Sequence, residues 1–247
     1  MIQHGELRLP TKPAAALRYS YLPGDAGADS LVVFINGLLL PRSGWHLTVE
    51  SFVKQQQEKA KTRPGLITYD RFGQGESDAD PVGDHDMEEV VRDLYTFIAI
   101  VKTRLETKRV SLVLVCNSIG CPIARLFNKA HPALVSAFLF LDSMMANTDF
   151  VSIFPDPDAP GFDEEALPQG VTVDGLRKAR DVYGRYFHPT VPNKERLDRS
   201  NAAQLLPHSD KPALSGLGTL GPLLTVVGHD WDVFALENEV GYVDAML

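Results

Sequence analysis

The stretch VSLVLVCNSIGCPIAR, at residues 110–125, decides the fold of this 247-residue chain. Its first half is a run of apolar and β-branched residues, which predicts a strand buried on both faces. An abrupt turn around Ser118 follows, and the apolar residues beyond Gly120 predict a helix. A strand, a sharp turn with a central serine and a helix form the layout of a nucleophile elbow. The alternative is an ordinary strand-to-helix turn in which a serine or asparagine caps the helix.

Such an elbow is so tight that the residues two before and two after its serine must be small. Gly120 meets that demand, and Cys116, also small, stands where the common G-x-S-x-G pattern has its first glycine. Ser118 would then stand at the carboxyl end of the strand. The backbone N–H of Ile119, at the start of the helix, would point at a developing oxyanion.

A second apolar run, LVVFI at residues 31–35, predicts another buried strand and ends in Asn36-Gly37-Leu38. The glycine lets the backbone turn, so that the Leu38 N–H would face the site as a second oxyanion donor beside that of Ile119. The alternative is a plain β-turn, which an Asn-Gly pair favours strongly.

Hydrophobic periodicity predicts the remaining elements. Strands are expected at 17–22, 65–69, 137–141 and 223–227, and helices at 45–59, 87–106, 173–186 and 193–205, with a closing helix from about 233. The loop DRFGQGES at 70–77 predicts a rigid polar turn, and it lacks the third glycine of a dinucleotide-binding fingerprint.

Seven prolines break the chain between residues 143 and 211 into short pieces. Loops this long inside a compact domain are uncommon unless they form a lid or a binding element. We therefore predict a core at residues 1–142 and 212–247 and a helical cap at 143–211. Its aromatic side chains would either line an apolar pocket or pack a small core of the cap itself; they are Phe150, Phe154, Phe162, Tyr183, Tyr186 and Phe187.

Composition restricts the partners of the chain. A net charge of −8 argues against nucleic acid or an anionic membrane, and no apolar run reaches the roughly 18 residues of a membrane span. The N-terminus has no secretory signal pattern. Cys116 and Cys121 lack a disulfide or metal pattern, which fits a reducing compartment. We expect a cytoplasmic protein without nucleic-acid or membrane partners, metal or organic cofactor.

The chain resembles the α/β-hydrolase superfamily, and within it the lid-bearing fungal members, over residues 17–142 and 222–240. Four motifs occur in the right order, each after an expected strand: Asn36-Gly37-Leu38, the loop at 70–77, Cys116-Asn117-Ser118-Ile119-Gly120, and Gly228-His229-Asp230. The resemblance implies an α/β fold, with a mostly parallel sheet flanked by helices and a helical cap inserted.

For the site, the resemblance implies that Ser118 attacks an acyl carbonyl and that the N–H groups of Leu38 and Ile119 hold the oxyanion. Asp230 matches the position of the acid in the order nucleophile, acid, histidine. Asp232 and Asp142 are further candidates for the acid, although helix capping or a solvated turn is the preferred interpretation of both.

The family pattern also needs a histidine beyond the acid, after a last strand. Only 17 residues follow Asp230 here, they read as a helix, and they contain no histidine. We therefore expect the last strand and that histidine to be missing, with dimerisation or aggregation through the exposed sheet edge. His229, His188, His208 and His46 are candidates for the base, although a turn or surface role is the preferred interpretation of each.

Three explanations fit these features: a truncated or alternative product, a pseudoenzyme that binds a small molecule, or a non-standard histidine base. The first is favoured because Ser118, both oxyanion positions and Asp230 remain. The predicted function is a serine hydrolase for a small apolar ester, lactone or related acyl substrate. The alternative is a catalytically inactive or truncated protein of this fold that binds a small molecule. A dehalogenase is disfavoured, because that chemistry needs a carboxylate where this elbow holds serine.

Overall fold

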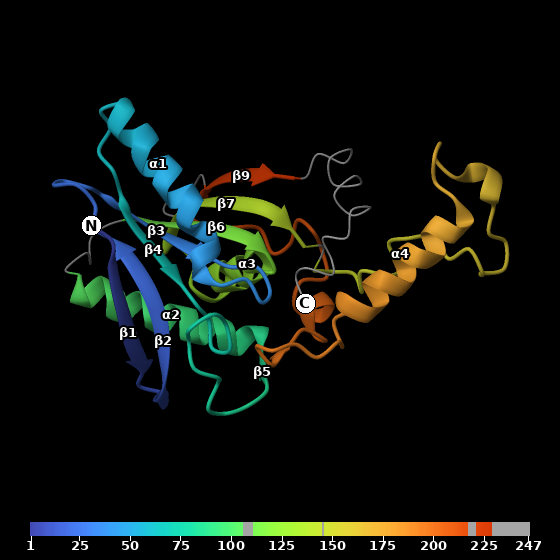
Figure 1. Ribbon diagram of the computed structural model, residues 1–247, viewed down its shortest axis with the longest axis horizontal. Helices are drawn as coiled ribbons and strands as arrows, with labels where there is room; N and C mark the ends of the chain where they lie inside the picture. The colour runs from blue at the N-terminus through green and yellow to red at the C-terminus, as the bar shows by residue number, and fades with distance from the viewer. Residues whose placement is uncertain (106–110, 145, 217–220, 229–247) are drawn as a thin grey trace.

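A computed structural model describes residues 1–105, 111–144, 146–216 and 221–228, and within these residues the main sheet has seven strands (Figure 1). Their order is β1-β2-β4-β3-β6-β7-β9, with β1 and β2 antiparallel and the others parallel to one another. The strands are β1 (Gln3–Leu9), β2 (Lys12–Leu22), β3 (Ser30–Ile35), β4 (Gly65–Tyr69), β6 (Ser111–Ser118), β7 (Val135–Ser143) and β9 (Leu223–Val227). The prediction of a mostly parallel α/β sheet is confirmed.

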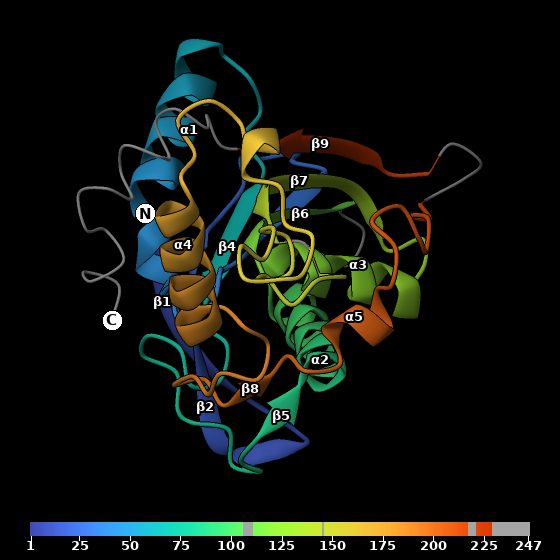
Figure 2. The same ribbon diagram turned by 90° about the vertical axis from the view of Figure 1, so that its right-hand side faces the viewer.

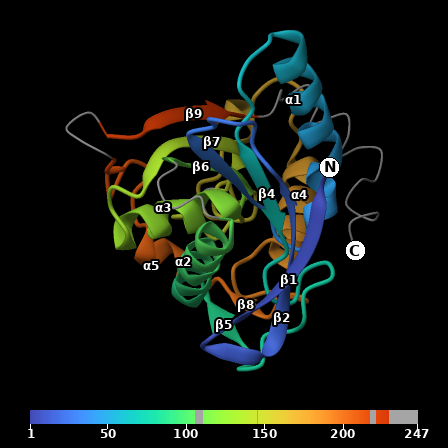
Figure 3. The same ribbon diagram turned by 90° about the vertical axis from the view of Figure 1, so that its left-hand side faces the viewer.

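Helices cover both faces of this sheet (Figure 3). On one face lies α1 (His46–Glu58), which a short 3₁₀ turn at Arg42–Trp45 precedes; on the other lie α2 (Met87–Arg104) and α3 (Gly120–Ala130). Two hydrophobic clusters correspond to the two faces, and the larger one lies under α2 and α3. The helix expected at 87–106 forms because its apolar stripe is buried and because Asp86 accepts a hydrogen bond from the Glu89 N–H at its start.

The antiparallel end of the sheet is larger than the sequence predicted. Only residues 17–22 were expected as an outer strand, whereas β2 begins at Lys12 and forms a hairpin with β1. The alternation in β1 is weak, since only Leu7 and Leu9 of its side chains are buried. The hairpin therefore depends on contacts with the sheet and α2 rather than on a strong local pattern.

The segment at 143–211 contains α4 (Val173–Tyr186), as predicted, and a 3₁₀ turn at Glu164–Ala166. The predicted helix at 193–205 is wrong: the structure has a two-residue strand β8 (Leu197–Asp198), paired with β5 (His85–Asp86), and only a short helix α5 (Ala202–Leu205). The Asn193 side chain accepts a hydrogen bond from the Leu197 N–H and donates one to the Leu197 carbonyl, and so favours a turn over a helix.

The strand predicted at 223–227 is confirmed as β9, and it forms the edge of the sheet beside β7. All five residues of β9 are exposed among the residues that the structure describes. The expected closing helix and the expected lack of a further strand and histidine fall on residues 229–247, which lie outside the described part. Dimerisation through this edge stays a prediction. No helix in the described part of the chain is long and apolar enough to cross a membrane.

Candidate functional site

Ser118 occupies the sharp turn between β6 and α3. It has a φ of +49°, in the left-handed region that a residue with a side chain rarely adopts. Ile119 follows directly as the first flanking residue of α3, an 11-residue helix. A strained serine between a buried strand and a helix N-terminus is the backbone geometry that the sequence predicted.

The small residues around this turn have separate structural reasons. A Cβ placed on Gly120 would lie 2.5 Å from the Ile35 carbonyl oxygen and 3.1 Å from that of Asn36, so any side chain there would collide with backbone. Cys116 is fully buried in the sheet. Burial raises the pKa of the Cys121 thiol to about 12 and also raises that of Cys116, which keeps both thiols protonated.

The loop after β3 packs against this turn. β3 and β6 are parallel neighbours, and Ile35 pairs with Cys116, so both strands end at the same edge of the sheet. A Cβ placed on Gly37 would lie 2.7 Å from Oδ1 of Asn117 and 3.5 Å from Cβ of Ser118. The structure therefore places the backbone at Gly37 directly against the serine, where the sequence expected an oxyanion loop.

Two backbone N–H groups and one hydroxyl at this edge of the sheet have no hydrogen-bond partner among the described residues. Within residues 1–105, 111–144, 146–216 and 221–228, no hydrogen bond involves the N–H of Leu38, the N–H of Ile119 or Oγ of Ser118. The Ile119 N–H also lies at the positive end of the α3 dipole. Such unpaired donors beside a hydroxyl can stabilise negative charge that develops on a bound carbonyl oxygen.

The loop at 70–77 holds the neighbouring loop in place, a role that the sequence did not reveal. Arg71 donates to the carbonyl oxygens of Asn36, at 2.7 Å, and Gly37, at 3.0 Å. Gln74 Nε2 donates to the same Gly37 oxygen at 2.8 Å. The Asn36 side chain is also fixed, because it accepts from Trp45 Nε1 at 2.6 Å and donates to the Tyr69 carbonyl at 3.0 Å.

Asp70 organises the interior of that loop. Its buried carboxylate accepts from the Arg42 N–H at 2.6 Å and from the Arg42 guanidinium, and Ser77 Oγ donates to its carbonyl at 2.8 Å. A Cβ on Gly75, whose φ is +48°, would lie 2.5 Å from the Asp70 carboxylate. The aspartate, glycine and serine of this loop therefore shape its backbone.

No histidine side chain in the described residues makes a hydrogen bond to Ser118. Five of these histidines have other partners. His4 bonds to Ser20, His46 to Glu50, and His188 to Thr190. His85 lies against Asp80 and the Gly83 carbonyl, and His131 stacks on Tyr95. His229, Asp230 and Asp232 lie outside the described residues. Asp142 stands at the end of β7, where Ser143 pairs in register with Ser118.

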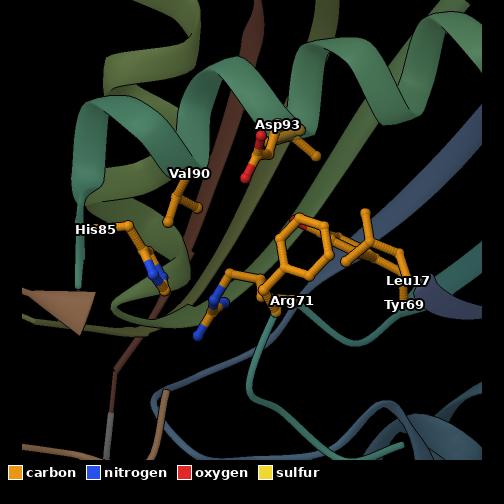
Figure 4. Close-up of a pocket in the computed structure, with 8 residues that line it drawn as sticks. Leu17, Tyr69, Arg71, His85, Val90 and Asp93 are labelled. Carbon is orange, nitrogen blue, oxygen red and sulfur yellow. The ribbon is translucent and has the colours of Figure 1, made fainter. Parts of the chain in front are cut away.

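A small cavity lies beside α2, and Ser118 is not among the residues that line it (Figure 4). It is lined by Leu17, Tyr69, Arg71, Phe72, His85, Val90, Asp93 and Leu94. The buried Tyr69 hydroxyl has no hydrogen-bond partner among the described atoms. No group of three His, Cys, Asp or Glu side chains in the described part of the chain is arranged to hold a metal ion.

The inserted segment (residues 143–211) projects from the sheet, with α4 as its largest element (Figures 1 and 2). Its aromatic rings pack on one another: Tyr183 lies 4.8 Å from Phe154 and 5.1 Å from Phe187, measured between ring centroids. Arg180 fixes the preceding turn by donating to the Val151 and Phe154 carbonyls. The sequence allowed the aromatic residues of this segment either to line a pocket or to pack on one another. Phe154, Tyr183 and Phe187 pack on one another.

The fold and the serine turn together define an α/β-hydrolase architecture, and comparison with known proteins agrees. The profile of the alpha/beta hydrolase family matches residues 32–240, so this chain belongs to that family. The sequence matches none of the curated proteins significantly.

Among solved structures, an epoxide hydrolase mutant from Vigna radiata is similar at 13% identity and a TM-score of 0.52, covering 92% of this chain and 80% of that one. The Cif epoxide hydrolase from Acinetobacter nosocomialis is similar at 15% identity and a TM-score of 0.46 over 63% of this chain. The match spans 42% of the length of that second protein. The Vigna likeness shows the shared fold.

Proposed function

We propose that this protein is a serine hydrolase that acts on a small apolar ester, lactone or related acyl substrate. Ser118 is the nucleophile, the N–H groups of Leu38 and Ile119 hold the oxyanion, and Asp230 is the acid. The inserted segment (residues 143–211) acts as the cap. The observation that carries the proposal is the strained Ser118, at φ +49°, beside two backbone N–H groups without partners in the described residues.

In the proposed reaction, Ser118 Oγ forms a bond to the acyl carbon while its proton passes to a base. The carbonyl electron pair moves onto oxygen, where the N–H groups of Leu38 and Ile119 bind it. Collapse of this intermediate breaks the bond to the leaving oxygen, which takes the proton. Water then releases the acid from the acyl-serine by the same route. This reaction uses a serine hydroxyl as the nucleophile. A dehalogenase would need a carboxylate at the same position, so the serine disfavours that alternative.

The position proposed for the acid follows from the sheet. β9 is parallel to β7, and its last residue, Val227, pairs with Leu141. The chain therefore leaves β9 at the same end of the parallel strands as Ser118, and Asp230 is three residues beyond Val227 in the sequence, which supports its proposed role. His229 is the one histidine of the sequence outside the described residues, which makes it the first base to test.

A second candidate is a catalytically silent protein of this fold that binds a small molecule. The observation that favours it is that, within the described residues, no histidine side chain makes a hydrogen bond to Ser118. Without a base, loss of one triad member would cost on the order of a million-fold in kcat. The two candidates differ in whether Ser118 is activated.

We expect the folded protein to gain the mass of one probe less HF on treatment with a fluorophosphonate, because the serine oxygen displaces fluoride from phosphorus. Ser118→Ala should gain none, because only an activated serine reacts. Intact-protein mass spectrometry measures the gain. Ser143→Ala is the matched control, because Ser143 lies opposite Ser118 on β7 and is exposed, and it should react like the parent protein.

His229→Ala is expected to slow this reaction at least a hundredfold if His229 is the base. No mass gain in parent protein that circular dichroism shows to be folded would overturn the hydrolase proposal and leave the binding protein. Labelling that persists in Ser118→Ala would assign the reactivity to another side chain and would equally contradict it.

A further inference from the structure

Glu195 is a charged residue of the inserted segment whose side chain is buried. It is only 1% exposed, although it belongs to a proline-rich stretch of the chain. A Cβ placed on Gly73 would lie 2.8 Å from Cα of Glu195, so the two backbones are in direct contact. Glycine at position 73, with a φ of +78°, is what allows this approach.

The Glu195 carboxylate joins three parts of the candidate site. It pairs with the Arg71 guanidinium, with Nη2 at 3.0 Å and Nε at 3.1 Å from Oε2. Gln74 Nε2 donates to its Oε1 at 2.7 Å, and the backbone N–H of Leu39 donates to the same oxygen. The Glu195 carboxylate therefore holds Arg71 and Gln74, the two side chains that bind the Gly37 carbonyl. It also holds the backbone at Leu39.

These contacts set the direction in which the Leu38 N–H points. The Gly37 carbonyl and the Leu38 N–H belong to one planar peptide, and in a trans peptide the two groups point in opposite directions. Because Arg71 and Gln74 hold the carbonyl oxygen on their side, the Leu38 N–H is turned to the other side. That hydrogen is the donor that the proposed oxyanion hole requires.

The backbone of the loop would not keep this shape unaided. Leu39 has a φ of +61°, a conformation that a leucine rarely adopts. Its N–H is hydrogen-bonded to Glu195 in this conformation. The carboxylate thus stabilises a strained residue next to the proposed donor.

Glu195 is in turn tied to α4. The buried Arg199 guanidinium donates to the carbonyls of Phe187, His188 and Val191, which follow α4. Between Glu195 and Arg199, β8 pairs with β5 (Figure 2), and the His85 N–H donates to the Arg196 carbonyl at 3.2 Å. A movement of α4 would reach the oxyanion loop through these contacts.

We infer that Glu195 is a positioning residue that orients the Leu38 N–H through Arg71, Gln74 and Leu39, so that the oxyanion hole forms only when the inserted segment is seated. This inference rests on the proposed function for the role of the Leu38 N–H. The structural part, that Glu195 holds the loop at 36–41, has consequences that do not depend on catalysis.

Two measurements test the inference on Glu195→Gln, with the exposed Glu164→Gln of the same segment as the matched control. In hydrogen–deuterium exchange, peptides that cover residues 36–41 should exchange at least tenfold faster in Glu195→Gln, while peptides of β4 exchange as in the parent protein. In fluorophosphonate labelling, the maximal rate should fall about tenfold with an unchanged half-saturating probe concentration, because only oxyanion stabilisation is weakened. A residue with only a structural role would not lower the maximal rate while leaving the half-saturating probe concentration unchanged.

Should Glu195→Gln fail to fold, Gln74→Met replaces it, because this change removes one donor to the Gly37 carbonyl without leaving a buried charge unpaired. Faster exchange confined to 36–41 supports the structural part of the inference, that Glu195 holds this loop, even if the parent protein never reacts with the probe. In that case the hydrolase proposal falls, and the oxyanion role of the Leu38 N–H falls with it. Unchanged exchange at 36–41 in a folded variant overturns the inference, whether or not the parent protein is labelled. Equally faster exchange throughout the sheet overturns it as well.

Discussion

Lys12→Met is expected to lower the free energy of unfolding by about 3–5 kcal/mol, the usual cost of removing one partner from a buried charged cluster. Lys12 is 3% exposed and lies within 2.8 Å of Asp80, Asp93 and Glu89, with its ammonium 5.0 Å from the Phe72 ring centre. Burial alone would lower the pKa of Lys12, but its hydrogen bonds to the three carboxylates outweigh burial and raise it. Urea denaturation at neutral pH measures the loss.

The pH dependence of the Lys12→Met deficit has a definite sign. Burial already raises the pKa of Asp93 in spite of its hydrogen bond from Lys12, and the substitution removes that opposing contact. The folded variant therefore binds a proton more readily than the unfolded chain, and its stability rises as the pH falls. We expect a smaller deficit relative to the parent protein at pH 5 than at pH 8.

Lys54→Met is the matched control for Lys12→Met, because Lys54 is exposed on α1, and its effect should stay within about 0.5 kcal/mol. Equal stability of the two variants would contradict the assignment of Lys12 to a buried cluster. So would a deficit that grows as the pH falls.

Gly120→Ala is expected to destabilise the protein by about 1–3 kcal/mol, the range for forcing extra atoms into a packed site. The new methyl group would lie 2.5 Å from the Ile35 carbonyl oxygen, which belongs to a central strand and has little room to move. The expected shift separates the serine turn from the loop at Gly37, so fluorophosphonate labelling of Ser118 should also fall at least tenfold. Urea denaturation and labelling kinetics measure the two effects.

Gly184→Ala is the control, since it makes the same change inside a helix, where the nearest atom to the added methyl is a Val151 methyl at 3.8 Å. Better helix propensity should stabilise that variant by up to about 1 kcal/mol. A Gly120→Ala protein that is as stable and as reactive as Gly184→Ala would show that the turn tolerates a side chain, contrary to the geometry.

Local sequence patterns were sufficient for most of the sheet and for the serine turn. The apolar runs at 65–69 and 223–227 form strands with the predicted bounds, and α4 spans the predicted residues 173–186. These predictions succeed because a buried strand and an amphipathic helix have their own hydrophobic periods. The hairpin at β1 and the turn at Asn193 were mispredicted because contacts distant in sequence, or one side chain bonding to backbone, outweigh those periods there.

A serine between a buried strand and a helix, with small neighbours, can be recognised without the structure, because the elbow is a contiguous stretch with a fixed spacing. The way in which the loop at Gly37 is held can be seen only in the folded chain. Glu195 is 124 residues from Arg71 and 156 from Leu39, and it lies among prolines where no periodic pattern marks it. A buried carboxylate is selected by the charges and donors that surround it in space, and those partners meet only after the chain has folded.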